Sequence, residues 1–180
     1  MKLKENIKLF IFEAAAALCG ILTIVFAALP AYFEADKADL SLLEMAFGSG
    51  DRIQSNGLLI MAFIILVLGV VCSIALAVFQ ILHVKFLNDK VITIMAIASG
   101  ILVLVGGIIL TCGLFISGLD KANSSLGFTQ GNWGIKSGMI ITPIFTLISF
   151  ALCYPSALII LHHKDLADKE SKPANKEVKM

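Results

Sequence analysis

The sequence has few charged residues and almost no net charge. Charged side chains make up 15% of the 180 residues, against about 25% in an average soluble domain. Hydrophobic residues make up 58%, and the mean hydropathy is +0.94. A water-soluble enzyme needs more polar surface, and a disordered chain has less apolar sequence. The net charge of +1 provides no basic surface for nucleic acid. The composition therefore indicates an integral membrane protein.

The motifs of several common enzyme classes are also missing. The sequence has no P-loop, no G-x-G-x-x-G, no H-E-x-x-H and no G-x-S-x-G. Its four cysteines occur singly, without C-x-x-C spacing, and none falls in a predicted outer loop where a disulfide framework would form. We therefore expect a protein that is not an enzyme and that uses no catalytic residues, no cofactor and no metal ion.

Four apolar segments dominate the chain, at residues 7–30, 57–83, 91–117 and 135–162. Each exceeds the roughly 20 residues that cross a hydrocarbon core of about 30 Å. They lack the alternation of membrane strands, and a helix satisfies its own backbone hydrogen bonds in lipid. The first segment is interpreted as a retained helix rather than a cleaved signal. We predict an all-α, antiparallel membrane four-helix bundle over residues 1–163, followed by a disordered charged tail over 164–180.

The basic residues are distributed unevenly between the two sides of this bundle. Ten of the 14 lysines and arginines fall on the side that holds the N-terminus, the middle loop and the tail. This distribution places the protein in the cell membrane as a multi-pass protein with both termini in the cytoplasm. Asn123 then begins a formal glycosylation sequon, Asn-Ser-Ser, on the outer side.

The first outer loop contains the segment ADLSLLEMAFGSGD, which predicts a short amphipathic helix. Asp39 can serve as its N-cap, and Gly48 or Gly50 can end it. Its apolar bulk comes from four residues: Leu40, Leu43, Met45 and Phe47. We favour a helix that lies on the outer membrane surface as an anchor. The alternatives are a cap on the bundle and a surface for a partner.

Each span carries small or hydroxyl side chains at helical spacing, which favour close helix packing in lipid. These residues are Ala16, Gly20, Thr23 and Ala27; Gly69, Ser73 and Ala77; Ser99, Gly106 and Gly113; and Thr142, Thr146, Ser149, Cys153 and Ser156. The last span also holds Pro143 and Pro155. Its hydroxyls either bond the backbone of a kinked helix or line a polar path, and the first interpretation is favoured.

Glu13 is the acidic residue that lies well inside a span, about 9 Å along the helix from Ile7. An intramembrane acid is a functional candidate by default. A structural ion pair is favoured over a proton relay. Its partner would be Lys8 of the same segment or a basic residue at the same membrane face: His83, Lys85, Lys90, His162 or His163. The candidate functional polar residues are therefore Glu13, His83, Thr142, Thr146, Ser149 and Ser156.

The cysteines are interpreted mainly as small buried hydrophobic residues. Cys19, Cys72 and Cys153 share a similar depth in their spans, which leaves a soft-metal site for Cu(I) as the alternative. The adjacent His162 and His163 are interpreted as a boundary at the membrane interface.

The layout of four spans with a larger first outer loop is similar to that of claudins and tetraspanins. The W-x-x-L-W motif and paired cysteines of the claudin loop and the C-C-G of tetraspanins are absent. The SLLEMAFGSGD segment also resembles a short stretch in small bacterial four-helix membrane proteins. These resemblances imply a helical membrane fold and no particular activity.

We weigh three functions. The favoured one is a non-enzymatic subunit or scaffold of a membrane assembly, whose partners are the lipid bilayer and either a second copy of the chain or another membrane protein. The second is an oligomeric channel or small-solute transporter component, which depends on Glu13 and the polar stripe of the last span. The third is a membrane-embedded thiol or lipid enzyme. The absence of motifs determines this order.

Overall fold

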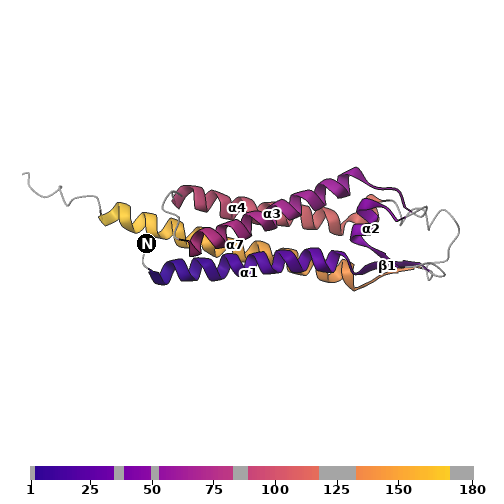
Figure 1. Cartoon of the computed structure of the whole chain (residues 1–180), viewed down its shortest axis with the longest axis horizontal. Helices are drawn as coiled ribbons and strands as arrows, with labels where there is room; N and C mark the ends of the chain where they lie inside the picture. Colours follow the sequence, from indigo (N-terminus) through magenta and orange to yellow (C-terminus); the bar gives the residue numbers. More distant parts are fainter. Residues whose placement is uncertain (1–2, 35–38, 50–52, 83–88, 118–132, 171–180) are drawn as a thin grey trace, which may run out of the picture.

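The computed structural model describes residues 3–34, 39–49, 53–82, 89–117 and 133–170. Within these residues, four long helices pack side by side (Figure 1). They are α1 (Leu3–Ala27), α3 (Gly57–Ile81), α4 (Asp89–Thr111) and α7 (Ser137–Glu170). Helix α1 packs along α3 and α7, and α4 packs along the same two helices. By length and composition, each can cross a membrane. The prediction of four membrane-spanning helices is therefore confirmed at this level.

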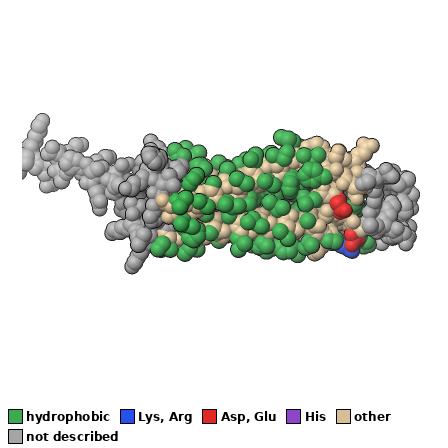
Figure 2. Space-filling view, viewed as in Figure 1, with side chains coloured by type: hydrophobic (Ala, Val, Ile, Leu, Met, Phe, Trp, Pro, Cys, Tyr) green, Lys and Arg blue, Asp and Glu red, His purple; other side chains and the backbone are tan. Residues whose placement is uncertain are grey.

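Large aliphatic side chains cover the outside of these helices, as Figure 2 shows for one face. On α1 the exposed aliphatic residues extend from Ile7 to Val25, and on α7 from Ile140 to Leu158. Each interval corresponds to about 27 Å of helix, close to the thickness of a hydrocarbon core. Water would solvate such a surface poorly, whereas lipid would cover it. The chain thus has the surface of a multi-pass membrane protein.

A small antiparallel sheet lies at one end of the helices, which we call the sheet end. Its described strands are β1 (Pro30–Glu34), β2 (Leu40–Ser41) and β3 (Trp133–Ile135), in the order β2-β1-β3. Phe33 of β1 pairs with Gly134 of β3. The start of α1 and the end of α7 both lie at the opposite end (Figure 1). The sheet corrects the strict all-α prediction, although the described residues are mostly helical.

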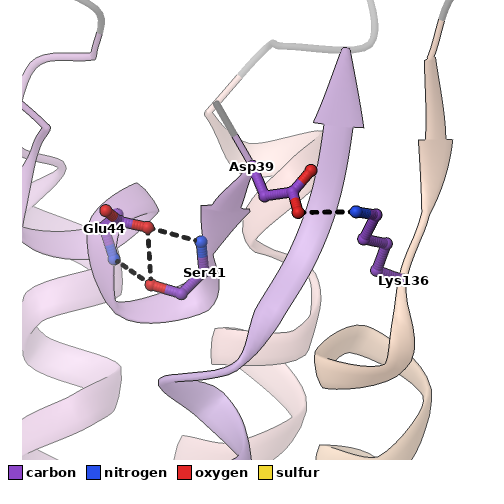
Figure 3. Close-up of polar contacts among 4 residues, drawn as sticks. All are labelled: Asp39, Ser41, Glu44 and Lys136. Carbon is purple, nitrogen blue, oxygen red and sulfur yellow. Dashed lines mark hydrogen bonds and ion pairs between the residues drawn. The ribbon is translucent and has the colours of Figure 1, made fainter. Parts of the chain in front are cut away.

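Helix α2 (Leu42–Phe47) begins and ends with well-defined caps. The Ser41 hydroxyl accepts a hydrogen bond from the backbone N–H of Glu44 at 3.1 Å, and the Glu44 carboxylate accepts one from the backbone N–H of Ser41 at 2.7 Å (Figure 3). Gly48 ends the helix with φ of 90°, which only glycine adopts without strain. Ser41, and not the predicted Asp39, is therefore the N-cap, whereas the predicted end at Gly48 is confirmed. Gly50 lies outside the described residues.

Asp39 instead links the sheet to α7. Its carboxylate accepts a hydrogen bond from the Lys136 ammonium at 2.6 Å (Figure 3). The same ammonium lies 5.5 Å from the centre of the Phe33 ring on β1. Lys136 immediately precedes α7, so these contacts join three segments at the sheet end.

The apolar side of α2 faces the interior of the protein. Leu40, Leu42 and Met45 are at most 1% exposed, and they share one buried cluster with Leu59 of α3 and Leu110 of α4. A surface anchor would instead expose these side chains to lipid. The favoured interpretation as a surface anchor was therefore wrong, and α2 caps the helices. Half-exposed Phe47 is the exception among its apolar residues.

Two further elements complete the described structure. The short helix α5 (Gly113–Ile116) follows α4 at the sheet end. Helix α7 continues to Glu170, past residue 163 where the charged tail was predicted to begin, so that boundary was wrong. The sequence explains the extension, since Lys164 and Asp168, and Asp165 and Lys169, have the i, i+4 spacing of opposite charges that supports a helix. The predicted tail beyond Glu170 lies outside the described residues.

Candidate functional site

Four polar residues, one from each long helix, are buried in the half of the protein opposite the sheet. We call Glu13 of α1, Ser73 of α3, Ser99 of α4 and Cys153 of α7 the inner polar cluster. None is more than 2% exposed. The Ser99 hydroxyl lies 3.8 Å from the Cys153 sulfur. The Ser73 hydroxyl is also hydrogen-bonded to this thiol, and the Glu13 carboxyl is within electrostatic range of it. Cys153 is therefore the residue that each of the other three polar side chains interacts with, through hydrogen bonds with Ser73 and Ser99 and electrostatically with Glu13.

Glu13 points into the protein and not toward the lipid headgroups. The exposed residues of its helix, such as Ile11 and Leu18, lie on the other side. A carboxyl group at this depth is costly to bury unless polar groups lie near it, and the Cys153 thiol of the inner polar cluster is within electrostatic range of it. His83, the candidate predicted from the same membrane face, lies outside the described residues.

The hydroxyls predicted on the last span are satisfied by backbone carbonyls. Thr142 donates to Gly138 at 2.5 Å, and Thr146 donates to Thr142 at 2.9 Å, both within α7. Ser149 donates to the Ala16 carbonyl of α1 at 2.8 Å. These three hydroxyls are thus used in helix bonding, as the favoured interpretation predicted for Thr142 and Thr146. For Ser156, only its place in α7 is described.

Glycines bring the helices into direct contact in the half nearer the sheet. A methyl group on Gly106 of α4 would lie 2.6 Å from the carbonyl oxygen of Ala62 on α3. A methyl group on Gly69 would lie 2.8 Å from the backbone nitrogen of Val103. Gly107 similarly leaves no space against Thr146 of α7. In this half α4 is therefore in direct contact with α3 and with α7, and the predicted small-residue sides do face the interior.

The cysteines considered as an alternative metal site are not brought together. Cys153 is buried, Cys19 and Cys72 are partly exposed, and Cys112 is exposed. Among the described residues, no three His, Cys, Asp or Glu side chains gather in an arrangement that could hold a metal ion. The three-thiol arrangement considered as an alternative is therefore not formed. The side chains of His162 and His163, and all of Asn123, lie outside the described residues.

The members of the inner polar cluster were predicted separately, in different roles, and not as one group. Ser73 and Ser99 were assigned to helix packing alone, and the buried Gln80 and Thr93 were not identified. The periodicity of α1 is the signal that could have revealed the position of Glu13. Glu13 lies three residues before Ala16, and so continues the small-residue side of α1. That spacing places its side chain in the interior.

The inner polar cluster combines a carboxyl group, two hydroxyls and a thiol. Such groups can exchange protons and form hydrogen bonds with water or a small polar molecule. Comparison of the chain with protein-family models, curated proteins and solved structures found no match.

Proposed function

We propose that the protein is a non-enzymatic subunit or scaffold of a membrane assembly, built as an antiparallel four-helix bundle. The observation that supports this proposal is the direct contact of α3 and α4 through Gly69 and Gly106. A rigid core of this kind suits a protein that holds others in place. The partner is a second copy of the chain or another membrane protein.

The cell membrane and a cytoplasmic location of both termini are parts of the same proposal. The start of α1 and the end of α7 lie at one end of the helices (Figure 1). The segments that belong to this end carry ten of the 14 basic residues, which is the distribution of a cytoplasmic side. A tag fused to either terminus should resist protease added to intact cells. Digestion of such a tag would contradict the orientation.

Cross-linking in cells, followed by purification in mild detergent, tests the scaffold function. We expect a defined complex whose composition depends on an intact bundle. Gly106→Leu should disperse this complex, because the larger side chain forces α3 and α4 apart. Ile101→Leu, a change on the exposed side of α4, is the matched control and should leave the complex intact. A monodisperse monomer that captures nothing would contradict the scaffold function.

A second function, as a component of an oligomeric channel or small-solute transporter, is favoured by the burial of Glu13 inside the helices. Flux assays in liposomes test it. Glu13→Gln should alter any flux, because it removes the titratable carboxyl group. Thr146→Val is the control, since the Thr146 hydroxyl is already bonded within its own helix. Absence of flux across a broad panel of ions and solutes would contradict this function.

A further inference from the structure

The inner polar cluster has the composition of an internal hydration site. We propose that Glu13, Ser73, Ser99 and Cys153 bind water inside the protein, and that this water arrives from the end opposite the sheet. The inference goes beyond the scaffold function and does not depend on it. A scaffold needs only a packed interior, whereas this site would hold bound water in one half of the interior.

The buried Ser73 hydroxyl lacks a strong hydrogen-bond partner among the described residues. It is 1% exposed, and apart from the Cys153 thiol it has no hydrogen-bond partner among the described residues. A thiol is a weak hydrogen-bond partner, whereas nearly all buried hydroxyls in proteins have a strong one, from the protein or from ordered water. A water molecule beside Ser73 would satisfy this hydroxyl.

The surrounding groups can complete the coordination of such a water. A buried water usually makes about three hydrogen bonds. The Ser99 hydroxyl donates its hydrogen to the Ala96 carbonyl at 2.9 Å, which leaves its oxygen able to accept another. The Glu13 carboxyl and the Cys153 thiol belong to the same cluster. All four long helices thus contribute a polar group.

The packing on either side of the cluster gives the direction of entry. Toward the sheet, a methyl group on Gly20 of α1 would lie 2.7 Å from Val70 of α3, so the two helices are in close contact. In the opposite direction, the next polar residues buried on α3 and α4 are Gln80 and Thr93. Gln80 follows Ser73 by seven residues, or about 10 Å of helix. Among the described residues of these two helices, the buried polar side chains beyond the cluster therefore lie on the side away from the sheet.

Hydrogen–deuterium exchange of the Cys153 thiol tests the site, with D₂O as the probe. The S–H stretching band in the infrared spectrum reports each thiol directly. The protein reconstituted in lipid, with Cys19, Cys72 and Cys112 replaced by alanine, isolates the band of Cys153. We expect its S–H band to disappear soon after transfer to D₂O. A variant that keeps only Cys72 is the matched control, since Cys72 has a similar depth but lies partly exposed on α3. Its thiol should exchange more slowly, because it is not part of the proposed hydration site.

The Ser73 hydroxyl should determine how well the water is held. Adding Ser73→Ala to the Cys153-only protein removes one hydrogen-bond partner, and we expect exchange to slow by about tenfold. If the multiple variant does not fold, the difference spectrum between wild type and Cys153→Ser isolates the same band. Exchange of Cys153 no faster than that of Cys72 would overturn the proposal. An exchange rate unchanged by Ser73→Ala would overturn it equally.

Discussion

The contact at Gly106 offers the most direct test of how closely α3 and α4 pack. The smallest possible enlargement is Gly106→Ala. Its methyl carbon would lie 2.6 Å from the Ala62 carbonyl oxygen and from the Leu66 backbone nitrogen, and 2.9 Å from the Leu66 Cα. All three are backbone atoms, so no side-chain rotation can relieve the clash. The two helices must move apart, or one must shift along the other.

Two opposing effects determine the size of the change. Overpacking a well-packed interior costs about 1–3 kcal/mol, and a clash with backbone atoms belongs to the upper part of this range. Replacing glycine by alanine inside a helix gains about 1 kcal/mol. We therefore expect Gly106→Ala to lower the free energy of unfolding by about 1–2 kcal/mol. Gly106→Leu should lower it further.

The measurement is the free energy of unfolding in mixed micelles titrated with a denaturing detergent, followed by circular dichroism. Gly57→Ala is the matched control, because a methyl group at the first residue of α3 meets no atom within 4 Å. It should leave the stability unchanged or raise it slightly. If Gly106→Ala proved as stable as Gly57→Ala, the close contact between α3 and α4 would be refuted.

Other substitutions test the remaining contacts in the same titration. Ser149→Ala should lower the free energy of unfolding by about 0.6 kcal/mol, the average for a hydrogen bond between membrane helices. Thr146→Val should lower it less, because the Thr146 hydroxyl bonds within its own helix. Equal losses of stability would contradict this distinction. Ser41→Ala should lower the free energy of unfolding by about 0.5–2 kcal/mol, because α2 loses its N-cap. Backbone hydrogen exchange in α2 should become faster, and an unchanged exchange rate would contradict the capping role of Ser41. A double-mutant cycle of Lys136→Ala and Asp39→Asn should give a coupling free energy of at most about 1 kcal/mol, as expected for a partly exposed ion pair. This coupling should decrease with added salt. A coupling insensitive to salt would contradict the prediction.

The sequence was sufficient to predict the long helices because lipid imposes a simple requirement on them. The apolar segment predicted at 57–83 corresponds to α3 at Gly57–Ile81. The start of α3 is also determined by neighbouring residues, since the Asn56 side chain accepts hydrogen bonds from the N–H groups of Leu58 and Leu59. Length, hydropathy and cap residues are all properties of a short stretch of chain. Such properties can be read without knowing the rest of the fold.

The contacts at the sheet end could not be predicted in the same way. The pairing of Phe33 with Gly134 joins segments about 100 residues apart, and the strands are too short to show an alternating pattern. The same limit applies to α2. Its amphipathic pattern predicted a helix with one buried face, but the pattern does not say whether lipid or protein covers Leu42 and Met45. Only the position of α2 over the ends of the long helices decides that.

The interior side of α1 explains why one periodic pattern produces two different environments. Glu13 and Gly20 are seven residues apart and so lie on the same side of the helix. At Gly20 the lack of a side chain lets α3 approach, with Val70 in contact. At Glu13 a long polar side chain points into the interior instead, within electrostatic range of the Cys153 thiol of α7. Periodicity therefore determines which residues face the interior, while the size and polarity of each one determine whether that level is closed or polar. Enlarging a residue at the level of Gly20 should disturb helix packing, whereas Glu13→Gln should leave packing intact and change only what the polar half can bind.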